Sequence, residues 1–508
     1  MKRCLLVALL LLTACSSGTP SGAGGTSSSG SGASASGGSN ASASPVDPTT
    51  WPTAGHDLAN TRATLDSHIT AATVGTLTTL WRTELPDAVS LSTTPIVDDG
   101  TIYVGSGNGH VFAVDAMTGA IDWTSAATGF NIGPYGVAVD DQRVYSLDGS
   151  AGVVALDRSN GTTLWSTDVT ATDSTGIDIQ PIVVDGLVIV GSVPVSIHGI
   201  YAPGDHGVVT ALDAATGAVR WTFDTVEPGL WGHPEVNSGG GAWYPPAVDA
   251  ARGLLYVGTA NPAPFPGTTD WPNGSSRPGA NLYTDSIVAL DLHTGALRWY
   301  LQVTPHDLFD RDQVHALIAN GVGEDTVVSA GKSGVLVGVD PDSGAQRWRT
   351  EVGLHENDQL TALSGPTEIA PGTYGGILTP PAYADGVVYA AVINAPTTLQ
   401  PDATAYFGAK FGQQPGAVAA VDARDGHVLW STPVPGDPLG AATVVGDLVF
   451  TATVDGTVLA LRRSDGTIVQ QLPAGGMVNG WMAALDDRLV IPVGGSNPPS
   501  LLALGLPA

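Results

Sequence analysis

The sequence has 508 residues and a net charge of −28 at pH 7, from 47 acidic and 19 basic side chains. This acidic charge argues against nucleic acid or an anionic membrane surface as a partner, because both would repel the protein. The alternative explanation of the charge is solubility in an extracellular medium. The chain is long for one ordinary compact domain, but its length is normal for a repeat architecture.

The first fourteen residues have the features of an export signal. Lys2 and Arg3 precede an apolar run, residues 5–12, that is too short to span a bilayer. The run ends in Leu-Thr-Ala-Cys at residues 12–15, which resembles the lipobox of bacterial lipoproteins. The resemblance implies cleavage before Cys15 and a lipid on its sulfur; the alternative is an ordinary secretory signal. We therefore expect residues 1–14 to be a signal peptide and the protein to be extracytoplasmic, lipid-anchored to a bacterial membrane.

Cysteine usage and low complexity define the next segment. Cys4 is the only other cysteine and would be removed with the signal, so the remaining chain has no disulfide, no CxxC zinc pair and no CxxCH haem site. Any electrons that the protein handles must therefore pass to a separate acceptor. Residues 15–48 read as the lipidated cysteine followed by a flexible Ser/Gly-rich tether, and residues 49–508 as the folded domain.

The strongest signal in the folded part is an internal repeat. Its pattern is a small residue, an apolar residue and Asp, then Gly four positions later and Trp four positions after that. It occurs as AVDAMTGAIDW (113–123), ALDRSNGTTLW (155–165), ALDAATGAVRW (211–221), ALDLHTGALRW (289–299), GVDPDSGAQRW (338–348) and AVDARDGHVLW (420–430), with a degenerate copy ALRRSDGTIVQ (460–470). Apolar alternation on both sides of an Asp-to-Gly turn predicts a β-hairpin.

A second hairpin precedes most copies, such as PIVVDGLVIVGS at residues 181–192. Two hairpins make a four-stranded unit, the blade of a β-propeller, and the Trp residues are expected to pack between blades. GWMAALDDRLVIPV (480–493) is an eighth unit that lacks its Trp strand, which LTTLWRTEL (77–85) can supply. We predict an all-β, eight-bladed propeller of four-stranded antiparallel blades, closed by an N-terminal strand. Seven or nine blades are alternatives.

The repeat resembles the tryptophan-docking motif of the pyrroloquinoline-quinone (PQQ) alcohol dehydrogenase family. Non-catalytic propellers, such as the outer-membrane assembly lipoproteins, carry the same repeat. The segment WPTAGHD (51–57), with Asn60, Thr61 and Arg62, looks like the N-terminal signature of the dehydrogenases and is expected to brace the propeller.

Two further segments extend the resemblance to the family's pocket. In GGGAWYPPAVD (239–249), Trp243 matches the tryptophan that lies flat against the quinone ring. In GTANP (258–262), Asn261 matches an amide that binds the metal. Core packing is the alternative role for Trp243, and a turn is the alternative role for Asn261.

The most specific match is TPHDLFD (304–310), which corresponds to the family's T-P-x-D-x-W-D segment. The resemblance implies that Asp310 is the general base, and Asp312 matches an extra aspartate of lanthanide-using members. Asp310, Asp312 and Asn261 are thus the expected ligands of calcium or a lanthanide. Lys332 falls where the family has a cation beside the quinone carbonyls. The alternatives are two solvated loop acids and an exposed turn lysine.

The chain also departs from the family pattern. The segment VPVSIHGIYAPGDH (193–206) has no Glu where the family places a metal ligand, and the adjacent cysteine pair is absent. Ser92 replaces an expected Glu, and Tyr135 replaces an expected Arg. The sequence thus predicts a PQQ- and metal-dependent dehydrogenase oxidising a small alcohol or sugar. The alternative is a non-catalytic propeller that serves as a protein-binding scaffold.

Overall fold

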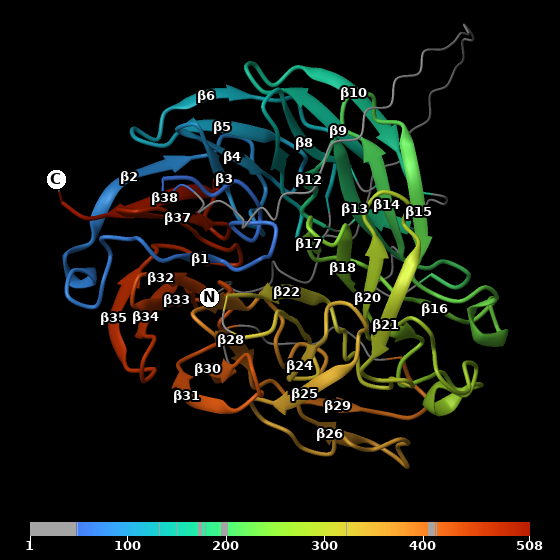
Figure 1. Cartoon of the computed structure of the whole chain (residues 1–508). Coiled ribbons are helices and arrows are strands. Elements are labelled where there is room, and N and C mark those ends of the chain that lie inside the picture. The colour runs from blue at the N-terminus through green and yellow to red at the C-terminus, as the bar shows by residue number, and fades with distance from the viewer. Residues whose placement is uncertain are drawn as a thin grey trace, which may run out of the picture.

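The computed structural model of the chain describes residue 47 and residues 49–507, apart from 132, 150, 171–174, 178, 195–201, 322, 405–411 and 413. The expected signal peptide, Cys15 and almost all of the tether lie outside these residues. The described chain is a ring of four-stranded antiparallel sheets, as Figure 1 shows by the succession of colours around the ring. Within it, no helix has the length and apolar character needed to cross a membrane.

The first four blades follow one another in chain order. Blade 1 consists of β3 (Ile96–Asp98), β4 (Thr101–Gly105), β5 (Val111–Asp115) and β6 (Ile121–Thr124), and blade 2 of β7 (Ala138–Val139), β8 (Arg143–Asp148), β9 (Gly152–Asp157) and β10 (Thr163–Asp168). Blade 3 consists of β12 (Ile182–Val184), β13 (Leu187–Pro194), β14 (Val208–Asp213) and β15 (Val219–Asp224), and blade 4 of β17 (Ala247–Asp249), β18 (Leu254–Gly258), β20 (Ser286–Asp291) and β21 (Leu297–Gln302).

The last four blades complete the ring and confirm the predicted number of eight. Blade 5 consists of β22 (His315–Ala319), β23 (Thr326–Ala330), β24 (Val335–Val339) and β25 (Gln346–Glu351), and blade 6 of β27 (Ala382–Ala384), β28 (Val387–Ile393), β30 (Gly416–Asp422) and β31 (Val428–Val434). Blade 7 consists of β32 (Thr443–Val445), β33 (Leu448–Ala452), β34 (Thr457–Arg462) and β35 (Ile468–Pro473), and blade 8 of β36 (Ala483–Ala484), β37 (Arg488–Val493), β38 (Ser500–Gly505) and β2 (Thr78–Glu84).

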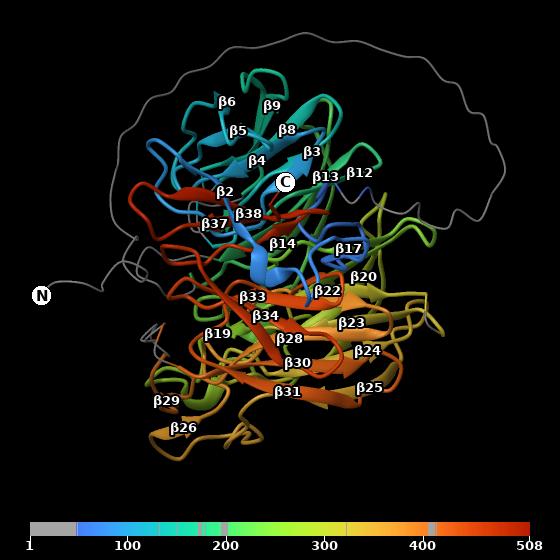
Figure 2. The same cartoon turned by 90° about the vertical axis from the view of Figure 1, so that its left-hand side faces the viewer.

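Short elements decorate this ring. They are β1 (Ala63–Thr64), which pairs in parallel with β32; β11 (Thr175–Ile177), which pairs with β13; the two-stranded sheets β16 (Ser238–Gly239) with β19 (Pro262–Ala263) and β26 (Thr367–Ile369) with β29 (Thr397–Leu399); and the 3-10 turns η1 (Val74–Thr76), η2 (Leu230–Gly232) and η3 (Pro272–Gly274). The β26–β29 sheet lies at the margin of the molecule in both views (Figures 1 and 2).

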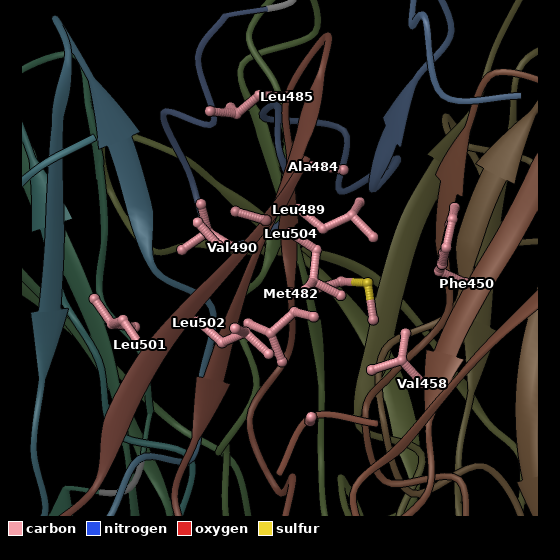
Figure 3. Close-up of a cluster of buried hydrophobic side chains, with 14 of the residues drawn as sticks. Phe450, Val458, Met482, Ala484, Leu485, Leu489, Val490, Leu501, Leu502 and Leu504 are labelled. Carbon is pink, nitrogen blue, oxygen red and sulfur yellow. The ribbon is translucent and has the colours of Figure 1, made fainter. Parts of the chain in front are cut away.

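The N-terminal strand closes the ring as predicted. In Figure 1, β2 lies beside β38, the last strand of the chain, and the two pair from Thr78 with Gly505 to Glu84 with Ser500. Blades 7 and 8 meet through an apolar cluster, in which Met482 and Leu504 lie toward Phe450 and Val458 (Figure 3). In blade 7 the degenerate repeat has Gln470 at the position of the tryptophan that would pack against the next blade. Burial of apolar side chains therefore stabilises the contact between blades 7 and 8.

The repeat residues work as an interlock between neighbouring blades. Asp291 Oδ1 accepts the backbone N–H of Thr294 at 2.9 Å and so closes the turn, which Gly295 completes at φ +69°. The indole of Trp221, from the preceding blade, packs against Gly295 and donates its Nε1–H to the Leu292 carbonyl at 3.0 Å. A Cβ at Gly295 would lie 2.5 Å from that indole, so the glycine is required by contact as well as by conformation. The expected inter-blade packing of the Trp residues is confirmed.

The segment from Trp51 to Arg62 braces one end of the ring axis. Its carbonyls accept backbone N–H groups from the inner strands of successive blades, at Leu58 from Val248, at Ala59 from Ile318, at Thr61 from Tyr383 and at Arg62 from Val444, over 2.7–2.9 Å. The fully buried Arg62 guanidinium donates to the carbonyls of Ala54, Ala442 and Met482 and to the Thr94 and Thr443 hydroxyls. One short segment thus links blades 4 to 7, and Arg62 extends the contacts to the segments that precede the inner strands of blades 8 and 1.

Candidate functional site

The loops that precede the inner strands lie at one end of the ring axis. Trp243 precedes β17, Asp310 and Asp312 precede β22, Asn261 follows β18, and Lys332 follows β23. Because β17 and β22 begin at that end while β18 and β23 finish there, all these side chains belong to one end of neighbouring blades 4 and 5.

The loop before β22 has its shape set by a buried carboxylate. Asp307 accepts the backbone N–H groups of Phe309 and Arg311, both at 2.7 Å. Leu308 and Phe309 pack in a buried cluster with Leu363, Ile369 and Leu399, which anchors the loop to the β26–β29 sheet. Asp310 and Asp312 are then held with positive φ, +66° and +33°. Non-glycine residues rarely adopt this conformation, and such strain concentrates at functional sites.

The two carboxylates converge on one ammonium. Lys332 Nζ lies 3.0 Å from Asp310 Oδ1 and 2.6 Å from Asp312 Oδ2, and the three side chains are 7%, 2% and 0% exposed for Lys332, Asp310 and Asp312. The other oxygen of Asp312 accepts the backbone N–H of Asn261 at 2.7 Å. These residues are therefore neither solvated loop acids nor an exposed turn lysine.

An aromatic face adjoins the ammonium. Lys332 Nζ lies 4.9 Å from the ring centroid of Trp243, within range of a cation–π interaction. Trp243 is half-buried and packs against Tyr244, whose ring stacks on Trp481 further along the axis. The structure thus brings Asp310, Asp312, Lys332 and Trp243 together. Asn261 joins them through its main chain, while its side-chain Nδ2 donates to the Pro262 carbonyl at 3.0 Å.

The electrostatics of the site follow from its burial. Burial raises the pKa of Asp310 well above the usual aspartate range, and the Lys332 charge opposes this rise. A carboxyl with a raised pKa holds a proton more readily, which suits a group that accepts one from a substrate.

Sequence reasoning missed a further buried acid, Asp285. Its side chain is 0% exposed, and neither of its carboxylate oxygens has a hydrogen-bond partner. Burial, and next the negative charge of Asp307, raises the pKa of Asp285 well above its ordinary value, which favours the neutral form. An aspartate just before a strand looks like an ordinary turn residue, so the sequence held no distinguishing signal for it.

The site fits a multivalent cation on one side. Two carboxylates that already meet at a single positive charge have the donor chemistry and the convergence that a hard metal ion uses, and the ammonium stands in for that ion. Among the described residues, however, no group of three or more His, Cys, Asp or Glu side chains surrounds such a position. Any metal would therefore depend on the two aspartates together with neutral oxygen ligands, for which the Asn261 side chain is the candidate.

Two described residues on the side expected to hold the carboxylates of a quinone cofactor carry no charge. Ser92 donates its hydroxyl to the Gly133 carbonyl at 2.8 Å, and the buried Tyr135 hydroxyl is hydrogen-bonded to Ser90. Most of the segment in which the family's Glu was sought, residues 195–201, lies outside the described part of the chain. The aromatic face, the ammonium and the carboxylates fit the quinone ring, whereas Ser92 and Tyr135 supply no charge for the cofactor's acidic groups.

Comparisons with known proteins agree with the fold. Residues 170–320 match the family described as "Glucose/ethanol/alcohol dehydrogenase, beta-propeller domain", and residues 65–199 match "Outer membrane protein assembly factor BamB". The chain is 29% identical over 404 residues to the quinohemoprotein alcohol dehydrogenase of Comamonas testosteroni, covering 69% of this chain and 56% of that protein.

A second relative is quinohemoprotein alcohol dehydrogenase ADH IIB of Pseudomonas putida, 34% identical over 293 residues, with 51% of this chain and 40% of the relative covered. The chain thus spans about half the length of the curated relatives it matches. The crystal structure of the Comamonas testosteroni enzyme superposes with a TM-score of 0.76 at 25% identity, over 90% of this chain and 80% of that chain.

Proposed function

We propose that this chain, a β-propeller of the PQQ-dependent alcohol dehydrogenase-like type, is a dehydrogenase that uses PQQ and a metal ion to oxidise a small alcohol or sugar. The observation that carries the proposal is the buried convergence of Asp310, Asp312 and Lys332 beside the Trp243 ring. The similarity to quinohemoprotein alcohol dehydrogenases supports the substrate class.

Each side chain has a role that its position supports. When bound, PQQ accepts the two electrons that the substrate loses, and these must pass on to a separate acceptor. Asp310 takes the hydroxyl proton of the substrate on its carboxylate. The indole of Trp243 supplies a flat apolar face, and Lys332 supplies positive charge where negative charge develops. Asp310, Asp312 and the Asn261 side chain would hold calcium or a lanthanide.

The experiment combines the purified chain with PQQ and with calcium or a lanthanide. Cofactor binding is followed by absorbance, and turnover by dye-linked oxidation of simple alcohols and sugars. We expect a spectral change and a metal-dependent rate. No spectral change and no turnover with any metal would refute the proposal.

The uncharged Ser92 and Tyr135 favour a second candidate, a non-catalytic propeller that acts as a protein-binding scaffold. The match of residues 65–199 to the BamB family is consistent with it. In this case PQQ would leave the absorbance unchanged, while the chain would be recovered in a stable complex with another envelope protein.

We also propose that the protein is extracytoplasmic and lipid-anchored through Cys15, on the strength of the Leu-Thr-Ala-Cys sequence at residues 12–15. Growth with a labelled fatty acid should label the native chain and leave the Cys15→Ala variant unlabelled. Labelling of the variant, or its absence from both, would contradict the anchor.

A further inference from the structure

We infer that the Lys332 ammonium and a multivalent metal ion compete for one position between Asp310 and Asp312, so that binding of the metal swings the lysine side chain out of the carboxylate pair. This inference rests on the metal dependence proposed above. It adds that the protein carries its own substitute cation and that metal loading moves a residue of the pocket.

Distances make the two cations mutually exclusive. Lys332 Nζ lies 2.6 Å from Asp312 Oδ2 and 3.0 Å from Asp310 Oδ1. A calcium-sized ion binds carboxylate oxygens at about 2.3–2.6 Å. An ion bound to the same two oxygens from the side on which Nζ lies would need the space that the ammonium fills, so both cannot bind there.

The carboxylates cannot open to admit a second cation beside the first. Asp312 Oδ1 is fixed by the Asn261 backbone N–H at 2.7 Å. The loop that carries both aspartates is held by the two hydrogen bonds to Asp307, at 2.7 Å each. The pair therefore presents one position of fixed width.

The main chain of Lys332 is equally constrained. Its N–H donates to the Asp312 carbonyl at 3.0 Å, and the next N–H, of Ser333, donates to the Arg311 carbonyl at 2.9 Å. Gly376 packs so closely on Lys332 that a Cβ there would lie 2.1 Å from the lysine carbonyl oxygen. Only the flexible side chain can yield, and rotation about its own bonds is the available movement.

The Trp243 ring gives the displaced ammonium a place to go. Nζ is already 4.9 Å from the ring centroid, so a cation–π contact can replace part of the lost ion pair. The same ring face is where the quinone is proposed to lie. Metal binding would thus turn Lys332 from a partner of the aspartates into a donor facing the cofactor position.

A terbium titration of the purified chain, without PQQ or alcohol, tests the competition in solution. Terbium luminescence excited through the indoles reports binding at the Trp243 pocket. We expect Lys332→Met to raise the terbium affinity about tenfold or more, the factor given by one charge-assisted hydrogen bond that no longer has to be broken. Arg298→Met, which removes an exposed positive charge paired with Asp291, is the matched control and should leave the affinity unchanged. Asp312→Asn should abolish the signal.

Equal or weaker binding by Lys332→Met, or binding that survives Asp312→Asn, would overturn the inference. A crystal structure of the terbium complex of the unaltered chain decides the matter if the variant fails to fold. We expect terbium between the two aspartates and Nζ beyond about 4 Å from both. Terbium in that position with Nζ still in contact with both carboxylates would refute the exchange. Absence of PQQ turnover would count against the proposed function and leave these metal measurements intact.

Discussion

Lys332 and Asp312 form a buried ion pair in which Nζ and Oδ2 are 2.6 Å apart, closer than the 3.0 Å between Nζ and Asp310 Oδ1. Asp312 thus meets the ammonium on one oxygen and the Asn261 N–H on the other. The Lys332 ammonium also donates a hydrogen bond to Asp310 Oδ1, so the two acids share its charge.

Asp310→Asn removes the base while keeping its shape. We expect turnover to fall by about 10²–10⁴-fold, the usual contribution of general base catalysis, because an amide cannot take the hydroxyl proton. Dye-linked oxidation measures the loss, and the melting temperature should change little because the amide fills the same space. A variant with native turnover would remove Asp310 from the mechanism.

Lys332→Met leaves two buried carboxylates without their cation. We expect the free energy of unfolding in urea to fall by about 3–5 kcal/mol, the usual effect of breaking a buried pair from one side. Added calcium or terbium should restore much of the loss, because a metal can replace the missing charge. Arg298→Met, an exposed pair, should lose no more than about 1 kcal/mol.

Arg62→Met tests the brace on the ring axis. The guanidinium serves five acceptors, which the methionine would leave buried and unpaired. We expect a loss of about 3 kcal/mol or more in unfolding free energy. The lanthanide affinity, measured at a temperature at which the variant is folded, should be unchanged, since Arg62 contacts neither Asp310 nor Asp312. A stable variant would show that closure by β2 is sufficient for the ring.

Gly295→Ala and Gly186→Ala separate conformational strain from blade packing. Both glycines have positive φ, +69° and +72°, but only an alanine at 295 would collide with an indole, at 2.5 Å from Trp221, whereas a Cβ at 186 meets nothing within 4 Å. We expect Gly186→Ala to cost about 1 kcal/mol and Gly295→Ala several times more, in urea unfolding. Equal losses would mean that the tryptophan interlock adapts freely.

Two buried histidines of the axis predict loss of stability in acid. Burial lowers the pKa of His56 to about 4 and that of His315 to about 3. In the unfolded chain both titrate near 6.5, so the unfolded state binds their protons first as the pH falls. Stability should therefore decline from about pH 6.5 down to about pH 3, where the folded-state pKa of His315 lies, by a few kcal/mol.

The combined variant His56→Gln and His315→Gln tests this assignment. Its unfolding free energy should depend less on pH over the same interval, in urea titrations at a series of pH values. An unchanged pH profile would assign the acid sensitivity to other groups.

Local sequence was sufficient for the architecture. Blades 1 to 6 each carry a turn closed by Asp and Gly, with alternating strands on both sides, and these patterns involve residues close together in the chain. The missing tryptophan strand of the last unit even identified its replacement near Trp81, since an unpaired edge needs a partner.

The site depended on tertiary structure. The sequence named Asp310, Asp312 and Lys332, but it could not show that the lysine fills the position between the two acids, because that contact joins the loops before β22 and after β23. Nor did it reveal Asp285, whose burial without a hydrogen-bond partner depends on packing around it. Short periodic patterns in the sequence determine which strands pair, because most paired strands are close together in the chain. The convergence of charges near the ring axis depends instead on how the loops of neighbouring blades meet in space.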